Sequence, residues 1–441
     1  MRKPSINEAR MSLSKQSESP FLQGTNLTAV GDYNRSVVLD TIRKAGQISR
    51  VEVSHLTGLT SQTVTNMVRK LIDSGLVQEE GTVTVGRGKP RTAIRLNPDG
   101  RYAVGIHLEP AKTTVILINL AGHIIDRDLP DLPDDSAQAI AALASTVSLL
   151  LGRNGIPGKR MGGIGIAIPG PVDARRGTVL DPPNLSGWRN VRLAHDLELS
   201  TGLPVFMEKD VTAACHGQTW AGKGEETGQD FLFMYMGLGI AFGTVRHGHV
   251  YQGRTGNVGE MGHIVVDTSG PACWCGQRGC VAVTCDPRSL VKQAEKEGLF
   301  PAPTHVQDPR AFNDSADLPF LDEAFKSLCQ RAHGGDEVCR DLLLESAGRI
   351  GRAVTILTDL WDMDTVVFGG PYWHLLEDIY LDRVAQVLRR RSVLRQVHDF
   401  KVLSTTLGGD IAAIGAASAI LDHDLTPGPA PGMSGKDRSA I

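Results

Sequence analysis

A histidine and three cysteines lie close together in the second half of the chain, at His263, Cys273, Cys275 and Cys280. One imidazole and three thiolates form the donor set of a closed, tetrahedral structural zinc site. Gly276 and Gly279 lie between the last two cysteines and permit the tight turns that a short ligand loop needs. We therefore predict a structural Zn²⁺ ion bound by these four side chains. Buried free cysteines are the alternative.

The other cysteines are less informative. The chain has seven in total, and clustering of this kind in a large chain favours a metal over disulfides. Cys285 is close enough to the cluster to complicate the ligand assignment, whereas we expect Cys215, Cys329 and Cys339 to be structural.

A helical pattern with short glycine-marked breaks runs from Asn26 to Leu76. The first helix is predicted over 34–45, where apolar residues recur on one face. Ser49 lies three residues before Glu52, which is the spacing of a capping box and predicts the start of a second helix. That helix is expected to stop at Gly58.

A third helix is predicted between its cap, Thr60 or Ser61, and Gly75. Two short helices joined by a tight turn with a glycine, the second helix being longer, form a helix-turn-helix. Small polar and amide side chains on such a helix suit base edges in the major groove, and cations suit phosphates. The residues predicted to contact DNA here are Arg50, Ser61, Gln62, Thr63, Thr65, Asn66, Arg69 and Lys70. The alternative is a three-helix module for dimerisation or protein docking.

The stretch that follows is locally basic. Val77–Glu80 and Thr82–Val85 are predicted as two strands of a wing. From Gly81 to Pro98 the chain has a local charge of +4 and no acid. Its extended, flexible centre suits a narrow, electronegative A·T minor groove, with contacts predicted from Arg87, Lys89 and Arg91. A solvated basic loop is the alternative.

The composition is that of an ordinary globular protein with more than one domain. At 441 residues the chain exceeds what a single core usually holds, and 41% of it is hydrophobic. The net charge of −3 means that any DNA-binding surface must be local. Ala137–Leu151 is too short for a membrane span and predicts a buried or amphipathic helix. No secretory pattern is recognised, so we expect a cytoplasmic protein that does not contact membranes.

From Tyr102 onward, β-rich runs alternate with helical segments, which predicts an α/β domain. The predicted strands are Val104–Leu108, Thr114–Leu120, Ile164–Ile168, Pro204–Met207, Phe231–Met236 and Thr365–Phe368. Asn97–Gly100 has strong turn chemistry and marks the boundary between the two parts. We predict a disordered start (1–24), a DNA-binding domain (25–97), an α/β sensor domain (98–425) and a flexible tail (426–441).

The segment from Asn34 to Val64 resembles the N-terminal domain of transcriptional regulators of the ROK (repressor, open reading frame, kinase) family. The rest resembles the ROK domain, and together they cover nearly all of 25–422. The motifs that carry the resemblance are Gly165–Asp173, Glu260–His263 and the cysteine cluster. The resemblance implies a winged helix-turn-helix followed by a two-lobed, actin/hexokinase-like (ribonuclease H-like) α/β domain. Such proteins are usually homodimers or homotetramers and bind a sugar or sugar derivative in the cleft.

The resemblance also assigns effector contacts. Glu260 and the zinc-bound His263 would hydrogen-bond sugar hydroxyls. Asp210 matches the aspartate that accepts a proton from the attacking hydroxyl in the family's kinases. Asn184 belongs to a loop that borders the same pocket.

Departures from the family pattern affect this sugar site. Lys209 precedes Asp210 where the family usually has asparagine, and we count it among the predicted effector contacts. Ala282 stands where a pocket glutamate normally follows the Gly-Cys pair. A gained cation and a lost acceptor indicate either an acidic or phosphorylated effector or a site that no longer binds sugar.

The phosphate-binding pattern is broken as well. A ROK kinase has an Asp-x-Gly-Gly-Thr loop whose backbone N–H groups approach ATP phosphates and whose aspartate helps to hold Mg²⁺. This chain has His107–Lys112 in that place, without glycine, and Pro110 also lacks an N–H donor. In the second phosphate loop, Leu238 replaces a hydroxyl residue. We therefore expect no kinase activity and assign no catalytic residue.

These features predict a homo-oligomeric transcriptional regulator, more specifically a repressor, that binds double-stranded operator DNA and responds to a sugar or sugar derivative. One alternative is a sugar kinase with an accessory DNA-binding domain, which the retained Asp210 supports. The other is a regulator controlled by a protein partner.

Overall fold

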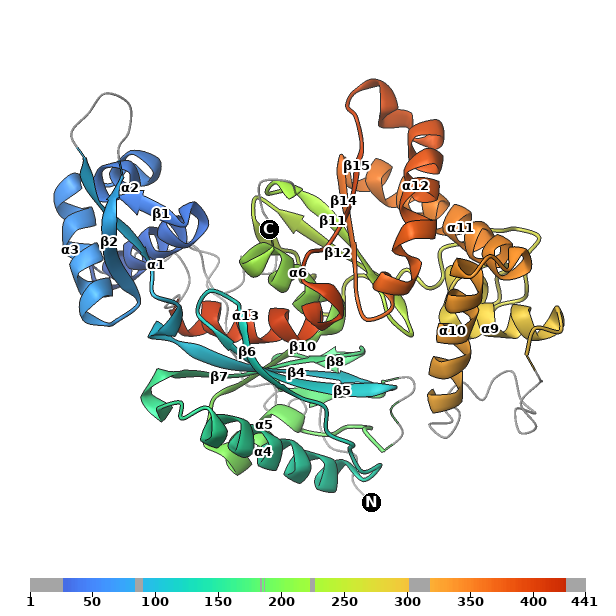
Figure 1. The fold of residues 1–441 in the computed structure, drawn as a ribbon, viewed down its shortest axis with the longest axis horizontal. Helices are drawn as coiled ribbons and strands as arrows, with labels where there is room; N and C mark the ends of the chain where they lie inside the picture. Colours follow the sequence, from blue (N-terminus) through green and yellow to red (C-terminus); the bar gives the residue numbers. More distant parts are fainter. Residues whose placement is uncertain are drawn as a thin grey trace, which may run out of the picture.

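The structure, a computed structural model, has a small N-terminal domain followed by two larger lobes (Figure 1). It describes residues 27–83, 90–182, 185, 187–222, 227–300 and 318–425. The predicted disordered start and flexible tail lie outside these residues. In the part of the chain that is described, no helix is long and apolar enough to cross a membrane.

The N-terminal domain packs helices α1 (Leu27–Ala45), α2 (Arg50–Thr57) and α3 (Ser61–Asp73) against an antiparallel sheet. The strands are β1 (Gln47–Ser49), β2 (Val77–Val83) and β3 (Arg91–Leu96), in the order β1-β3-β2. This arrangement, in blue in Figure 1, is a winged helix-turn-helix.

Local sequence signals set the ends of these helices. The capping box predicted at the start of α2 is present, with the Ser49 N–H donating to Glu52 Oε2 over 2.9 Å. Gly58 ends α2 with a φ of 69°, and the Thr60 side chain caps α3. Helix α1 begins earlier than predicted, because Gly31 does not interrupt it. A single glycine costs a helix only about 1 kcal/mol relative to alanine.

The prediction of two wing strands over Val77–Glu80 and Thr82–Val85 is wrong. Over the described residues 77–83 the structure has one strand, β2, and its partner is β3. Gly81 has a φ of 67° beside a register shift between Glu79 and Thr82. The extra residue is therefore absorbed by a bulge and the chain does not turn back.

The first lobe is built on a mixed sheet in the order β10-β7-β4-β5-β6. Its strands are β4 (Tyr102–Glu109), β5 (Lys112–Asn119), β6 (Ile124–Asp128), β7 (Met161–Ile168) and β10 (Val205–Lys209). Helices α4 (Ser136–Arg153) and α5 (Leu193–Thr201) cover one face, and α13 (Ile411–Leu425) covers the other. A short hairpin of β8 (Val172–Asp173) and β9 (Thr178–Val179) follows β7. Every residue of β4 and β7 is buried, as expected for strands covered on both faces.

The second lobe has a sheet in the order β13-β12-β11-β14-β15. Its strands are β11 (Phe231–Met236), β12 (Ile240–Arg246), β13 (His249–Val250), β14 (Thr365–Gly369) and β15 (Lys401–Ser404). One face packs against the helical part of the lobe. These helices are α8 (Val281–Thr284), α9 (Pro287–Lys296), α10 (Leu318–His333), α11 (Glu337–Trp361) and α12 (Trp373–Arg391). The other face packs against α6 (Asp210–Ala221) and the start of α13.

The predicted α/β pattern is confirmed. The six predicted strand segments coincide with β4, β5, β7, β10, β11 and β14 to within a few residues. The segment Ala137–Leu151 lies inside α4. Strands β6, β8, β9, β12, β13 and β15 of the two lobes were not predicted.

Glycines allow α6 and α13 to form a thin layer between the two sheets. A Cβ atom on Gly165 of β7 would lie 1.8 Å from the carbonyl oxygen of Ala416 on α13. A Cβ on Gly415 of α13 would lie 1.6 Å from the carbonyl oxygen of Ala213 on α6. Backbone therefore rests directly on backbone in this layer, and α6 cannot shift without α13 and β7.

The N-terminal domain and the first lobe share one apolar cluster. Buried side chains of α1 and α3, such as Val38 and Val68, belong to the same contiguous cluster as Ile116 and Ile118 of β5 and Ala417 of α13. The link between these parts is also tied down: Asn97 Nδ2 donates to the Gly75 carbonyl over 2.7 Å, and the Leu120 N–H donates to the Pro98 carbonyl over 2.9 Å.

Replacing Gly165 by alanine tests the thin layer. The new methyl group overlaps the α13 backbone, so we expect the free energy of unfolding to fall by about 1–3 kcal/mol. Urea denaturation followed by circular dichroism measures the change. The control is Gly152→Ala on α4, where a Cβ meets nothing within 4 Å. That substitution should leave stability unchanged or raise it by about 1 kcal/mol. Equal effects of the two substitutions would contradict the tight-layer interpretation.

Candidate functional site

A cavity of about 100 Å³ lies between the two lobes. Its walls include residues at the carboxyl ends of β4, β7 and β10 and in the loop after β11. This edge of a sheet is where ligands bind in open α/β proteins. Of the predicted effector contacts, Lys209, Asp210 and Glu260 line the cavity. Asn184 lies outside the described residues, and His263 lies beside the cysteines and is not part of the cavity wall.

Lys209 is already paired within the protein. Its side chain is only 3% exposed, and its ammonium group donates to a carboxylate oxygen of Glu260 and to the Val258 carbonyl. A buried ammonium needs such partners, because water does not solvate it there. Its charge is therefore matched before a ligand enters, which weakens the interpretation of Lys209 as a receptor for an acidic effector.

Asp210 begins α6 at the edge of the cavity. Burial raises the pKa of its carboxyl group to about 6, although the charge of Lys209 opposes this shift. The Val211 N–H also donates to Asp210 Oδ1 over 2.7 Å. At neutral pH the group is mostly ionised, so it can accept hydrogen bonds from ligand hydroxyl groups.

Glu109 is a cavity residue that we did not predict. It ends β4, is 9% exposed and accepts a hydrogen bond from the Leu238 N–H over 3.3 Å. Burial raises the pKa of its carboxyl group to about 8, so it is mostly neutral at pH 7. Glu109 lies within the His107–Lys112 segment, which the sequence marked as unusual because it lacks the glycines of a phosphate loop. The lack of glycine did not indicate that the Glu109 side chain lines the cavity.

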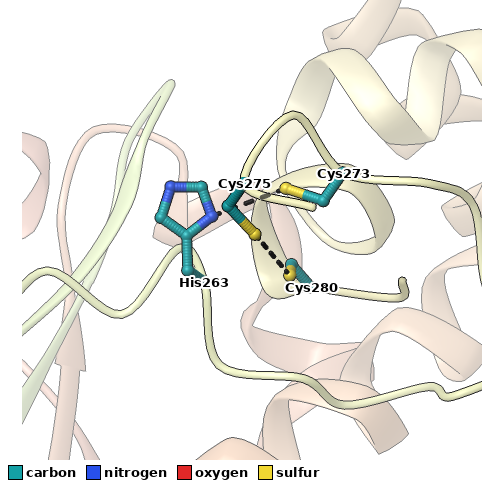
Figure 2. Close-up of side chains that lie close together, drawn as sticks. All are labelled: His263, Cys273, Cys275 and Cys280. Atoms are coloured by element: carbon teal, nitrogen blue, oxygen red, sulfur yellow. Dashed lines mark hydrogen bonds between the residues drawn. The ribbon is translucent and has the colours of Figure 1, made fainter. Parts of the chain in front are cut away.

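The predicted metal ligands converge (Figure 2). Their donor atoms all lie within 4.8 Å of one another. His263 Nδ1 is 3.5 Å from Cys273 Sγ, and Cys275 Sγ is 3.7 Å from Cys280 Sγ. Around a tetrahedral zinc, N–S and S–S pairs are separated by about 3.5–3.8 Å, given Zn–N and Zn–S bonds of about 2.0–2.3 Å. The four residues therefore form a candidate metal-binding cluster with spacing that fits a tetrahedral ion.

The loop around this cluster depends on its glycines. Gly276 and Gly279 have φ values of 91° and 65°, and a Cβ on Gly279 would lie 1.5 Å from the Asp267 carbonyl. The Cys273 N–H donates to the Gln277 carbonyl over 2.8 Å and closes the turn. Cys285 is not part of the cluster, because its thiol is buried against Thr284 and the Ser346 carbonyl.

The predicted recognition helix, α3, presents a polar surface. Side chains that are exposed or half-buried on its outer face are Ser61, Gln62, Thr63, Thr65, Asn66, Arg69 and Lys70. Gln62 and Arg69 both donate to Asn66 Oδ1, which holds these side chains in one row. Arg91 is exposed on β3, whereas Arg87 and Lys89 lie outside the described residues. Arg50 pairs with Glu79 over 2.6 Å, so its cation is already engaged within the domain.

The described chain combines a winged helix-turn-helix, a fold that binds DNA, with two α/β lobes that have a cavity between them. Residues 103–423 match the model of the ROK family, and residues 32–78 match a model described as winged helix-turn-helix DNA-binding. The chain belongs to the ROK family.

Named relatives are similar over most of the chain. A xylose repressor of Caldicellulosiruptor bescii is 26% identical, over 91% of this chain and 98% of the relative. The DNA-binding transcriptional repressor Mlc of Escherichia coli is 22% identical, over 90% and 94% of the two chains.

Solved structures share the fold. A ROK family transcriptional regulator, a homologue of E. coli Mlc, superposes with a TM-score of 0.71 at 24% identity, over 90% of this chain and 97% of that one. A ROK family glucokinase of Streptomyces griseus in complex with glucose and AMPPNP has a TM-score of 0.58 at 27% identity. The superposition covers 72% of this chain and 98% of the glucokinase chain.

Asp210→Asn tests the protonation of the cavity. The pKa of Asp210 in the folded chain, about 6, exceeds its ordinary value of 3.8. The bound proton therefore stabilises the fold fully below pH 3.8, and this stabilisation is lost as the pH rises through 6. The stability of the asparagine variant relative to the wild type should therefore increase with pH across this window and level off above it. Urea denaturation at a series of pH values measures the difference. A difference that does not change with pH would contradict the raised pKa.

Proposed function

We propose that this protein is a transcriptional repressor whose affinity for operator DNA changes when a sugar or sugar derivative binds between its lobes. Its relatives named as xylose repressor and Mlc, similar over nine-tenths of the chain, support this function. The polar outer face of α3 is the proposed DNA-reading surface, and the cavity at Lys209, Asp210 and Glu260 is the proposed effector site.

The observation that carries this proposal is the path of α6. This helix begins at Asp210 in the cavity wall and ends at Ala221, next to the N-terminal domain. Twelve residues of helix span about 18 Å. At its far end, Arg43 of α1 donates to the Trp220 carbonyl over 2.8 Å, and its guanidinium carbon lies 4.4 Å from the centre of the Trp220 ring. A single helix therefore links the cavity wall to α1 of the N-terminal domain, the domain that also contains α3.

The contact at the end of α6 is well defined. The Arg43 side chain is 11% exposed, and its guanidinium also pairs with Asp40. Trp220 Nε1 donates to the Leu120 carbonyl over 3.2 Å, which fixes the ring between the first lobe and α1. A stacked, hydrogen-bonded arginine transmits a displacement more directly than a flexible surface contact, because its orientation is fixed.

The cavity favours an effector rich in hydroxyl groups and without a phosphate. Lys209 is matched by Glu260, and the remaining charge at the wall is that of Asp210, which is negative. A phosphorylated ligand would bring further negative charge to this site without a free cation to meet it. Neutral sugars such as xylose are therefore the first candidates, in keeping with the name of the relatives.

A kinase function has less support. The similarity to the S. griseus glucokinase covers 72% of the length of this chain. In this protein, however, Glu109 at the end of β4 and Pro110 directly after it stand where phosphate binding requires glycine and free N–H groups. Asp210 is retained, but we propose that it contacts the effector and does not serve as a base.

We further propose that the metal cluster binds Zn²⁺. Cys₃His with tetrahedral spacing is a structural zinc set. The ion would fix the loop from His263 to Cys280, and Glu260 lies three residues before the first ligand. The metal therefore stabilises the segment that holds the partner of Lys209.

Two copies of the protein are proposed to act on one operator. A single helix-turn-helix reads one half-site, and dimers read two half-sites a helical turn apart on a palindromic sequence. Light scattering of the protein with duplexes that contain one or two half-sites tests this assembly.

Arg43→Ala tests the function and its path together. The probe is an operator duplex selected in vitro with the full-length protein, and affinity is measured by fluorescence anisotropy with and without xylose, glucose or N-acetylglucosamine. In the wild type, an active sugar should change operator affinity by about 5–150-fold. In Arg43→Ala this ratio should fall towards one, while sugar binding and sugar-free operator affinity persist, because the α6–α1 contact is lost. Lys44→Ala, the neighbouring cation that pairs with Asp40, is the control and should respond like the wild type.

The possible failures of this experiment are distinguishable. If operator affinity is indifferent to every sugar that the protein binds, the proposed function is wrong. If Arg43→Ala responds fully, the function stands and the proposed path is wrong.

Cys275→Ser tests the zinc. This ligand is exposed, so its loss should not disturb the core. The wild type should contain zinc in a stoichiometric amount by elemental analysis, and the serine variant should lose it and unfold at a lower temperature. Cys285→Ala removes a nearby thiol outside the cluster and should retain the metal. Retention of full zinc by Cys275→Ser would refute the assigned ligand set.

A further inference from the structure

The end of β4 reaches across the cleft to the second lobe. His107 Nε2 lies 3.0 Å from the hydroxyl group of Tyr235 on β11, and both side chains are buried. Two residues further along β4, Glu109 Oε1 accepts the Leu238 N–H over 3.3 Å. Because alternate residues of a strand share a face, His107 and Glu109 together bridge the lobes on the same side of the cleft.

The partner of Glu109 is a glycine-flanked backbone turn. Leu238 lies between Gly237 and Gly239, and the Gly237 N–H donates to the Gly239 carbonyl over 3.1 Å. A Cβ on Gly237 would lie 3.2 Å from Glu109 Oε1, so the carboxyl group rests against the bare backbone of the turn. Backbone N–H groups in such turns bind anionic oxygens. Here an oxygen of the protein itself takes that place.

The bridge is formed by neutral groups. Burial raises the pKa of Glu109 to about 8. The charges of Asp210 and Asp322 raise it further, whereas the Leu238 N–H and the charge of Lys112 lower it, all by smaller amounts than burial. Burial also lowers the pKa of His107 to about 4. Both side chains are therefore largely uncharged at neutral pH, so the two hydrogen bonds join the lobes without burying a charge.

We propose that Glu109 is a specificity-determining residue: its carboxyl group occupies the anion-binding turn at Leu238 and so excludes ligands that carry a phosphate or diphosphate group. A phosphate that approached this turn would have to displace the side chain and the adjoining His107–Tyr235 contact. It would also face the ionised carboxylate of Asp210, while Lys209 in the same cavity wall is held by Glu260. Under the proposed function, charge at the cavity wall already disfavours a phosphorylated effector, and Glu109 adds a steric cause that does not depend on that function.

Substitutions of Glu109 in the full-length protein test the proposal. Glu109→Gly removes the side chain and opens the turn. Glu109→Gln keeps its shape, its acceptor for the Leu238 N–H and its neutral state, and serves as the matched control. The probe is inorganic pyrophosphate, with and without Mg²⁺, titrated in a calorimeter. Wild type and Glu109→Gln should show no detectable binding, and Glu109→Gly should bind with a Kd at least about tenfold below the detection limit of the titration.

Hydrogen exchange of the segment 236–240 provides a second measurement that needs no ligand. Loss of the hydrogen bond should speed exchange of the Leu238 amide by about tenfold in Glu109→Gly and leave it unchanged in Glu109→Gln. Glu109→Asp, which withdraws the carboxyl group by one methylene, replaces the glycine variant if circular dichroism shows that the latter is unfolded. Pyrophosphate binding by the wild type, or a folded Gly or Asp variant that gains neither affinity nor faster exchange, would overturn the proposal. Neither measurement involves DNA or sugar, so failure here is separate from failure of the proposed function.

Discussion

The backbone contact between α6 and α13 is the constraint on which the rest of this structure depends. Gly165, Gly415 and Ala213 bring β7, α13 and α6 so close together that no additional side-chain atom fits between them. The two sheets are therefore separated by a thin helical layer whose members cannot slide independently. Because α6 starts in the cavity wall and ends against α1, this layer fixes the position of Asp210 relative to the DNA-binding domain.

The same constraint explains the character of the cleft. The walls come from both lobes, and side chains such as Lys209 and Glu260 pair across it. At one end Glu109 and His107 join the first lobe to the second by neutral hydrogen bonds. The candidate metal-binding cluster begins at His263, three residues after Glu260. The cavity is thus bounded by hydrogen bonds and an ion pair within the protein. A ligand has to displace these contacts or add hydrogen bonds to the same groups.

Sequence patterns predicted the elements well where the signal was local. Ser49 with Glu52, Gly58 and Thr60 set the helix ends, because capping depends on neighbouring residues. The convergence of the candidate metal-binding residues was predictable because their types and spacing are contained in a short segment of the sequence. The wing was mispredicted because Gly81 suits both a turn and a bulge, and only pairing with β3 decides between them.

Contacts between distant segments could not be read from the sequence. The pairing of Lys209 with Glu260 joins residues 51 positions apart, and that of Glu109 with Leu238 joins residues 129 apart. Sequence reasoning identified Lys209 as a gained cation, but its significance depends on a partner supplied by the fold. Likewise Arg43 and Trp220 carried no motif, although their contact joins the domains.

The apolar cluster that α1 and α3 share with β5 and α13 bears on how such a protein evolves. A DNA-reading domain with its own closed core can be exchanged between proteins as a cassette. In this chain, Val38 and Val68 belong to a cluster that continues into the sensor, so an exchanged reader would arrive with an uncovered hydrophobic face unless the matching surface on α13 came with it. The outer residues of α3, the proposed recognition helix, can change without disturbing this cluster, whereas its inner residues can change only together with the sensor residues that they contact.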